Sequence, residues 1–468
     1  MKNAVALSFI CLLLFPSLIS ANVDRNSPQA QKALEIFRTI IAIPTVAGRG
    51  KVPEMAAYLA AEFRQAGFAE QDIQILPSGE TAALVVRYRG EVGSTKKPIL
   101  LLAHMDVVEA LAKDWQRPPF ALTQDDNYFY GRGILDNKLG VTMLTATFIR
   151  LKQQGFVPAR DLIIAFSGDE ETSMVTTKML ANERPDLAQA EYALNTDAGG
   201  GDLNGEGKAI AYLIQAAEKT YVTFEMTVKN PGGHSSRPSP DNAIYDLAAA
   251  LQKIQHYHFP VMWSDMTRDF FRTSGQQLGG ELGQAMLAFA NNPQDKKAAE
   301  RLEREPPYVG TTRTTCVATM LSAGHAENAL PQSATATVNC RVFPGVLVED
   351  VKQSLQKVVQ NSAIEFVTLG QPVESPISEL RDDVLAAVKK AVHARYPEVS
   401  IITYMESGGT DGMHYRKAGI PTWAMPSVFM QPDDMFAHGL NERLPIKTFY
   451  DGLDHWSIIL RELTGQQN

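Results

Sequence analysis

The chain has 468 residues, which is enough for two or three domains of ordinary size. Apolar residues make up 45% of it and charged residues 21%, which is the composition of a soluble globular protein. The net charge of −8 argues against binding to a nucleic-acid backbone, which attracts basic surfaces. No internal repeat or low-complexity run stands out, so the chain is expected to fold into ordinary globular domains.

The N-terminus differs from the rest of the chain. Lys2 precedes an apolar run from Ala4 to Phe15, and the small residue Ala21 follows a few positions later. A charged start, a short apolar run and a small residue at its end are typical of a secretory signal peptide. The run is too short to span a bilayer, and no later segment approaches that length. We therefore predict a signal peptide over residues 1–21, cleaved after Ala21, and a secreted or periplasmic protein with no membrane span in the mature chain.

The first part of the mature chain alternates helices with strands. Ser27 and Pro28 suit the cap and the first position of a helix over residues 27–41, and a second helix is expected near 53–67. Strands are predicted near 72–76, 82–88, 99–103, 162–166 and 192–194. A further helix begins after Asp136 and ends at Gly155. This alternation predicts an α/β domain with a mostly parallel sheet flanked by helices on both faces.

Three of the predicted strands end in residues that bind metals well. In chain order the strand ends carry His104 with Asp106, Glu170 with Glu171, and Asp197, and Asp136 lies in a glycine-punctuated loop that enters a helix. Ligands bind beyond the carboxyl ends of strands in open α/β sheets. Adjacent carboxylates repel each other unless a cation lies near them. Histidine nitrogen combined with carboxylate oxygen suits zinc, so the pattern predicts a catalytic metal site.

The middle of the chain has a different pattern. Four predicted strands alternate apolar with polar residues, near 221–228, 314–321, 333–342 and 364–368, and helices are expected over 242–255 and 347–361. We therefore predict an inserted α+β domain over residues 215–371, with a charged, helix-rich insertion at about 262–305. Cys316 and Cys340 lie in this domain, and either a disulfide or two buried free thiols fits an exported protein.

The α/β pattern returns after the insertion. A helix is expected over 382–396, strands over 401–405 and 422–425, and a closing helix from about Lys447. The catalytic domain is therefore predicted to be discontinuous, formed by residues 22–214 and 372–468. Its second part carries a glycine-rich loop at 408–411 and, near its end, His438.

Five motifs occur in a fixed order along the chain. They are His104-x-Asp106, Gly131-Arg-Gly-x-x-Asp136-x-Lys138, Glu170-Glu171, Asp197 and Ala437-His438-Gly439. In this order they resemble the co-catalytic di-zinc carboxypeptidase and aminoacylase family, which includes glutamate carboxypeptidase, succinyl-diaminopimelate desuccinylase, aminoacylase-1, carnosinase and yeast-type carboxypeptidase S. The resemblance extends from about Ser27 to the end of the chain. It implies a ferredoxin-like lid domain, whose enlarged form is most similar to the carboxypeptidase S branch.

The resemblance implies a role for each clustered residue. One Zn²⁺ would be bound by His104, Asp136 and Asp197, and a second Zn²⁺ by Asp136, Glu171 and His438. Cobalt or manganese are possible in place of zinc. Glu170 would be the general base, which takes a proton from the attacking water and passes it to the leaving nitrogen. Asp106 would orient His104 by accepting its other ring proton. The peptide bond after the bridging Asp136 would be cis.

The resemblance also implies a substrate site. His234 would reach the catalytic centre and stabilise the oxyanion, often from a partner subunit, which suggests a possible homodimer formed through the lid. Asn328 and Arg341 would hold a substrate carboxylate, since a guanidinium pairs with it through two hydrogen bonds. The backbone at Gly408, Gly409 and Thr410 would line the carboxylate side of the site. A plain hairpin at His234, or an ion pair between Arg341 and a nearby acid, stays open as an alternative.

We therefore predict an exported di-zinc metallohydrolase that cleaves the amide bond next to a C-terminal amino acid, in a dipeptide or an N-acyl amino acid. Asp197 leaves a second prediction open. Members with Asp at this position are often dipeptidases or aminopeptidases that read the free amino end, whereas many acylases have Glu. An inactive relative used for binding is a remote third prediction, because every implied ligand and the base are present.

Overall fold

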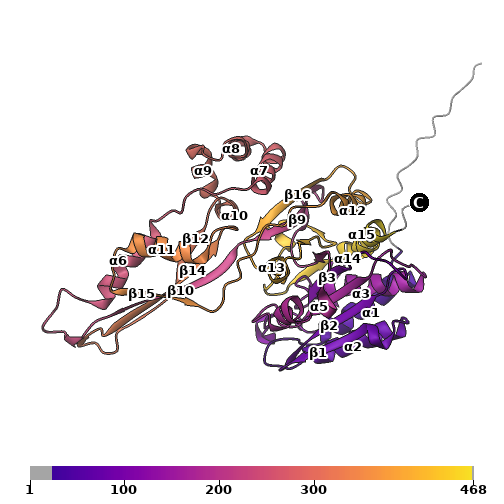
Figure 1. The fold of residues 1–468 in the computed structure, drawn as a ribbon, viewed down its shortest axis with the longest axis horizontal. Coiled ribbons are helices and arrows are strands. Elements are labelled where there is room, and N and C mark those ends of the chain that lie inside the picture. Colours follow the sequence, from indigo (N-terminus) through magenta and orange to yellow (C-terminus); the bar gives the residue numbers. More distant parts are fainter. Residues whose placement is uncertain (1–23, 466–468) are drawn as a thin grey trace, which may run out of the picture.

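The computed structural model describes residues 24–465, and the predicted signal peptide at residues 1–21 lies outside this range. Figure 1 shows a larger unit, built on a sheet flanked by helices, and a smaller elongated unit that extends from it. Within residues 24–465, no helix is long and apolar enough to cross a membrane.

The larger unit contains a mixed sheet of ten strands. Its central strands are parallel neighbours in the order β6–β3–β7–β17, and antiparallel pairs lie to either side. Every residue of β3 and β6 is buried, as their continuous apolar runs predict. The strands are β1 (Ile73–Ser78), β2 (Thr81–Tyr88), β3 (Ile99–His104), β6 (Leu162–Ser167), β7 (Tyr192–Asn195), β8 (Gly200–Leu203), β9 (Ala209–Glu218), β16 (Ser400–Glu406), β17 (Thr422–Ala424) and β18 (Phe429–Met430).

Helices cover both faces of this sheet, because alternate residues of each buried strand point to opposite sides. Leu101 packs into the core on one face, whereas Leu100 and Leu102 pack into the core on the other. The first core is covered by α1 (Pro28–Ala42), α2 (Val52–Gln65), α3 (Lys138–Gln153), α12 (Asp382–His393), α14 (Ile446–Asp451) and α15 (His455–Thr464). The second is covered by η3 (Met179–Glu183), which continues α4 (Val175–Lys178), and by α5 (Pro185–Ala188) and α13 (Gly412–Lys417). The predicted fold class is confirmed.

The smaller unit is a four-stranded antiparallel sheet with two helices packed on it. Its elements follow in the order β10 (Thr220–Lys229), α6 (Ala243–Gln255), β12 (Thr315–Ala323), β14 (Ser333–Val342), α11 (Val348–Val359) and β15 (Ile364–Leu369). The spatial order β12–β14–β10–β15, with a helix after the first and third strands, is the ferredoxin-like arrangement. The predicted lid fold is therefore confirmed.

The helix-rich insertion lies between α6 and β12 in the sequence and forms a small hydrophobic core of its own. It contains α7 (Asp265–Leu278), α8 (Gly280–Asn291), α9 (Lys296–Glu303) and α10 (Pro306–Val309). Ser264 caps α7 by accepting from the Thr267 amide. Helix α7 packs along β16 of the larger sheet, so the insertion bridges the two units.

Two features of the fold were not predicted. No strand was predicted for the glycine-rich segment after Asp197, but β8 and the long β9 form there and pair with each other. Gly201 packs directly on the ring of Phe429, so only glycine fits in this strand, and glycine weakens a strand pattern. A separate small sheet joins β4 (Thr123–Gln124), β5 (Tyr128–Tyr130) and β19 (Arg443–Pro445).

The two cysteines of the lid form a disulfide between Cys316 on β12 and Cys340 on β14, which are direct partners in the sheet. The alternative of two free thiols does not apply to this structure. The predicted domain boundaries stay predictions, although β9 of the larger sheet continues past residue 214 to Glu218.

Candidate metal centre and substrate pocket

The predicted metal-binding residues come together at the carboxyl ends of the parallel strands. His104 is the last residue of β3, and Asp197 follows the end of β7 by two residues. Glu170 and Glu171 lie in the loop that follows β6, and His438 is on a loop after β18. Only the His438 side chain is substantially exposed, at 50%. The site is therefore a buried cluster with one solvent-facing side.

Asp136 lies between the two histidines, with one oxygen turned to each. Its Oδ1 is 2.7 Å from His104 Nε2, and its Oδ2 is 3.1 Å from His438 Nε2. Asp197 Oδ1 is 3.4 Å from His104 Nε2, and Glu171 Oε1 is 2.8 Å from His438 Nε2. The five side chains thus form two halves that share Asp136, which matches the grouping implied by the resemblance.

The types of ligand atom in this cluster and their close spacing suit the binding of metal ions. Ligand atoms of His104, Glu170 and Asp197 all lie within 4.8 Å of one another, as do those of His104, Asp136 and Glu171. Burial raises the pKa of Asp197 to about 7, and the charge of Asp136 adds to this shift. Burial, followed by the charge of Asp197, raises the pKa of Glu170 well above its usual range. Such crowded, desolvated carboxylates are stabilised in their charged form by cations.

Asp106 lies beside His104, as expected, and also holds the neighbouring acidic pair. His104 Nδ1 lies 3.0 Å from the backbone oxygen of Asp106 and 3.5 Å from its carboxylate. The carboxylate also accepts hydrogen bonds from the backbone amides of Glu170 and Glu171, at 3.1 and 3.0 Å. The turn after β3 brings the carbonyl, not the side chain, closest to the ring. Asp106 is therefore placed to orient the acidic pair, and its carbonyl to orient His104.

The loop from Asp136 into α3 is fixed by residues to which the sequence analysis assigned no role. The peptide bond between Asp136 and Asn137 is cis, as the resemblance implied. Asn137 Nδ2 donates to Asp197 Oδ1 at 2.7 Å, and its own Oδ1 accepts from Thr196 Oγ1 at 2.7 Å. The fully buried Lys138 donates from Nζ to the carbonyls of Ile40 and Ile43. Only their position beside the motif aspartate pointed to these residues.

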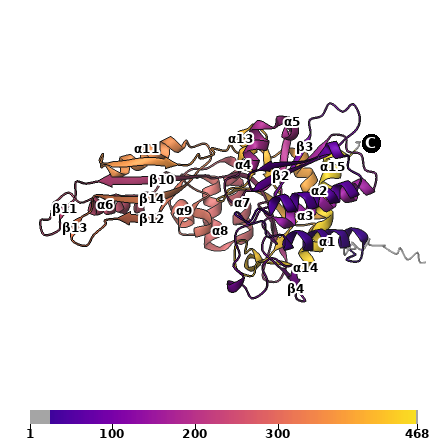
Figure 2. The same ribbon diagram turned by 90° about the horizontal axis from the view of Figure 1, so that it is seen from below.

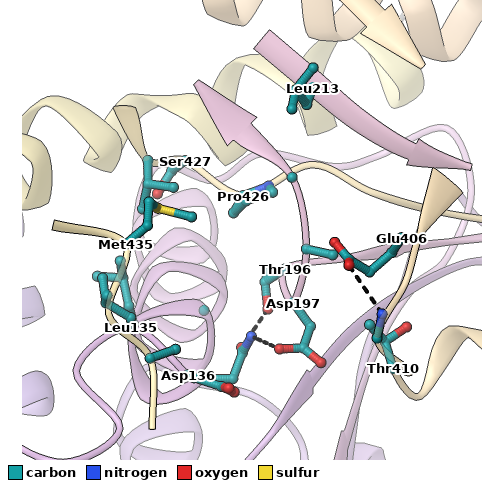
Figure 3. Close-up of a pocket in the computed structure, with 18 of the residues that line it drawn as sticks. Leu135, Asp136, Thr196, Asp197, Leu213, Glu406, Thr410, Pro426, Ser427 and Met435 are labelled. Carbon is teal, nitrogen blue, oxygen red and sulfur yellow. Dashed lines mark hydrogen bonds between the residues drawn. The ribbon is translucent and has the colours of Figure 1, made fainter. Parts of the chain in front are cut away.

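A cavity of about 550 Å³ lies against this cluster. Figure 3 shows Asp136 and Asp197 at one end, Leu135 and Met435 on one side, and Glu406 and Thr410 on the other. The apolar part of the lining is Leu135, Leu139, Leu213, Val428, Met430, Met435 and Trp456. The polar part includes the predicted loop residues Gly408, Gly409 and Thr410. The pocket therefore has a polar side and an apolar side next to one group of carboxylates.

Arg341, on β14 of the lid, contacts the residue that precedes the glycine loop on this polar side. Its Nη1 donates to the backbone oxygen of Ser407 at 3.0 Å, and its guanidinium lies over the ring of Tyr221. Within residues 24–465, no carboxylate lies within ion-pair distance of Arg341. The guanidinium is thus held beside the glycine loop without an acidic partner, which disfavours the ion-pair alternative.

His234 and Asn328 lie elsewhere. They belong to the two-stranded pair of β11 (Gly233–His234) and β13 (Ala329–Leu330) and its flanks, where the Ser235 amide donates to the Asn328 carbonyl at 3.0 Å. Figure 2 shows this pair at the end of the lid farthest from the large sheet. Both side chains are exposed. A single chain therefore does not bring them to the metal-binding cluster.

The model of the peptidase family M20/M25/M40 matches residues 100–462 of the chain. The chain belongs to this family. The family resemblance drawn from the five motifs is thereby confirmed, and the M20 protein described here is an enzyme, a metal-dependent hydrolase.

Relatives of this M20 protein include acylase-like and carboxypeptidase-like members. The human N-fatty-acyl-amino acid synthase/hydrolase PM20D1 is 29% identical over 365 residues, which covers 75% of this chain and 71% of that protein. The probable carboxypeptidase S-like 2 of Dictyostelium discoideum is 29% identical over 389 residues, covering 81% and 74%. Among solved structures, an M20 family metallo-carboxypeptidase of Sulfolobus solfataricus shares the fold, with a TM-score of 0.69, 18% identity, and coverage of 92% and 99%.

Proposed function

We propose that this M20 hydrolase cleaves the amide bond between an apolar acyl group and a C-terminal amino acid. The observation that carries the proposal is the position of Arg341, which is held against Ser407, the residue directly before the glycine loop that lines the polar side of the pocket. A guanidinium without an acidic partner in the protein can bind the free α-carboxylate of a substrate. The scissile amide would then lie at Asp136 and Asp197, and the acyl group would lie along the apolar side.

The apolar side of the pocket favours an N-acyl amino acid over a dipeptide. Leu135, Leu213 and Met435 offer contacts to hydrocarbon rather than to a charged amino terminus. The relative named as an N-fatty-acyl-amino acid synthase/hydrolase is consistent with this reading. Asp202 also lines the pocket and favours the second candidate, a dipeptidase or aminopeptidase that binds the amino end of its substrate.

A substrate series separates these two candidates. We expect kcat/KM to rise from N-acetyl to N-octanoyl derivatives of one amino acid, because each buried methylene contributes about 0.8 kcal/mol, roughly fourfold in rate constant. Leu213→Phe, which narrows the apolar side, should reduce the advantage of the octanoyl substrate and leave the acetyl substrate unaffected. A dipeptide with the same C-terminal residue that is cleaved faster than every N-acyl substrate would support the amino-end reading instead.

The proposed chemistry uses two metal ions, zinc with cobalt or manganese as alternatives. His104, Asp136 and Asp197 would hold one ion, and Asp136, Glu171 and His438 the other. Bound there, the ions would polarise the substrate carbonyl and lower the pKa of water. Glu170 is proposed as the general base, which removes a proton from the attacking water and delivers it to the leaving nitrogen. Asp106 keeps the backbone of Glu170 and Glu171 in place for these roles.

We also propose a homodimer through the lid, in which the partner supplies His234 and Asn328. Strand β12 is the edge of the lid sheet and exposes Val317, Met320 and Leu321, with 59–70% of each side chain accessible. An exposed apolar edge strand is a natural surface for pairing with a second copy. The distance of His234 from the metal-binding cluster of its own chain supports supply from the partner.

Complementation tests this arrangement. His234→Ala should lower kcat by about 10²–10³, the usual cost of losing one oxyanion donor, with metal content unchanged. Co-expression of His234→Ala with Glu170→Gln should restore activity, because one site of each mixed dimer then combines an intact Glu170 with an intact His234. A mixed dimer, verified by two affinity tags, that stays as inactive as its parents would contradict the proposal.

Export of the mature enzyme remains part of the proposal, and it rests on the signal-peptide pattern of residues 1–21. A lid disulfide between Cys316 and Cys340 suits an oxidising compartment.

A further inference from the structure

Glu442 connects the two segments that carry Asp136 and His438. It is fully buried and lies four residues after His438. Its carboxylate accepts hydrogen bonds from Arg132 Nη1 at 2.7 Å, from the Leu135 amide at 2.8 Å and from the Gly133 amide at 3.2 Å. The partners Arg132 and Glu442 are 310 residues apart in the sequence. One side chain therefore binds the loop that leads into Asp136 at three points.

Arg132 extends this connection to the backbone of His438. Its second terminal nitrogen, Nη2, donates to the His438 carbonyl at 3.2 Å. The face of its guanidinium lies over the Trp115 ring, at 5.1 Å from the ring centroid. Arg132 is itself almost fully buried, so its orientation is fixed by these contacts. Glu442 and Arg132 together thus reach both segments of the centre.

The segment that Glu442 holds has an unfavourable backbone conformation. His438 has φ 64° and Asn441 has φ 55°, both in the left-handed region that residues with a Cβ seldom adopt. The Asn441 side chain accepts from the Gln116 amide at 2.9 Å, which adds a further attachment. Such a conformation persists only where the surroundings hold it. The half-exposed His438 has no secondary structure of its own to fix it.

We infer that Glu442 is a positioning residue, which sets the distance between the His438 half and the His104 half of the metal centre. It does not bind metal itself, because donors from three residues already occupy its oxygens. The inference rests on the proposed ligand set and goes beyond it, since it assigns a role to a residue outside the ligands. His104 is the last residue of β3 and Asp197 follows β7 by two residues, so these two ligands depend less on Glu442 than His438 does, whereas Asp136 belongs to both halves.

Glu442→Gln tests the role without a change in size. The amide has one acceptor oxygen and an NH₂ group, so it cannot accept from Arg132 and from both backbone amides. We expect the Zn²⁺ that includes His438 to bind about 10–100-fold more weakly, the usual effect of losing a group that orients a ligand, and the Zn²⁺ held by His104 and Asp197 to lose clearly less affinity. Zn²⁺ titration of the metal-free full-length mature chain by calorimetry, with metal content by mass spectrometry, measures both affinities.

Glu218→Gln is the matched control. Glu218 is equally buried and pairs with the buried Arg416. It lies at the end of β9 and accepts from the Thr410 amide of the glycine loop, but it contacts no predicted metal ligand. The Glu218→Gln variant should lower the melting temperature about as much as Glu442→Gln does, and it should leave both Zn²⁺ affinities unchanged. Equal weakening of both ions in Glu442→Gln, or two wild-type affinities, would overturn the positioning role.

A second variant keeps the test decisive if Glu442→Gln fails to fold. Arg132→Lys retains the charge beside Glu442, yet a single ammonium cannot reproduce the fork that also reaches the His438 carbonyl. We expect the same selective weakening of one Zn²⁺. Unchanged binding of both ions by Arg132→Lys would overturn the inference. A wild type that binds fewer than two Zn²⁺ would overturn the proposed ligand set as well.

Discussion

Glu170→Gln is expected to lower kcat by about 10²–10⁴, the usual contribution of a general base, while both metal ions stay bound. The amide has the size of the carboxylate but cannot take up a proton. Its backbone amide would still donate to Asp106, so the neighbouring Glu171 should keep its place. Steady-state kinetics on an N-acyl amino acid, together with metal analysis of the same sample, provide the measurement.

Glu171→Gln is the matched control for this prediction. Glu171 contacts His438 Nε2 at 2.8 Å, so the same substitution there should release metal as well as activity. The Glu170→Gln and Glu171→Gln variants would then differ in metal content, although both would have a low kcat. A Glu170→Gln enzyme with near-normal kcat, or one that has lost metal, would show that Glu170 is not the base.

Arg341→Ala is expected to lower kcat/KM for an N-acyl amino acid by about 10–100-fold, since a hydrogen-bonded charged pair contributes about 1.5–3 kcal/mol. The corresponding C-terminal amide should be affected little, because it offers no charge to the guanidinium. Kinetics of both substrates with the wild type and the variant measure the difference. Arg341→Lys is the control, and it should retain part of the preference because it keeps the charge without the fork. An equal loss on acid and amide would mean that Arg341 only supports the lid through Ser407.

The sequence was most informative where function lies at the ends of regular elements. The apolar runs before His104 and Glu170 predicted buried parallel strands, and parallel strands place their carboxyl ends side by side. The clustering of the five predicted ligands followed from that arrangement and the motif order. The ferredoxin-like lid was implied by the resemblance and fits its alternating strands.

The sequence was least informative where one long-range contact decides a residue's role. Glu442 is a single acid in an irregular loop, and only the fold brings it to Arg132. Asp106 was expected to hold His104 by its side chain, but a turn of two residues left the backbone carbonyl nearer. His234 could not be placed by its motif, because its distance from the metal-binding cluster depends on the length of the lid.

The most direct test of the proposed function is a pair of substrates given to the wild-type enzyme: an N-octanoyl amino acid and its C-terminal amide. Metal-loaded protein should release the free amino acid from the acid form, with kcat/KM about 10–100-fold above that for the amide. Chelator-treated protein should release none. Equal cleavage of acid and amide would contradict the carboxylate site at Arg341 and favour an enzyme that reads the amino end of its substrate.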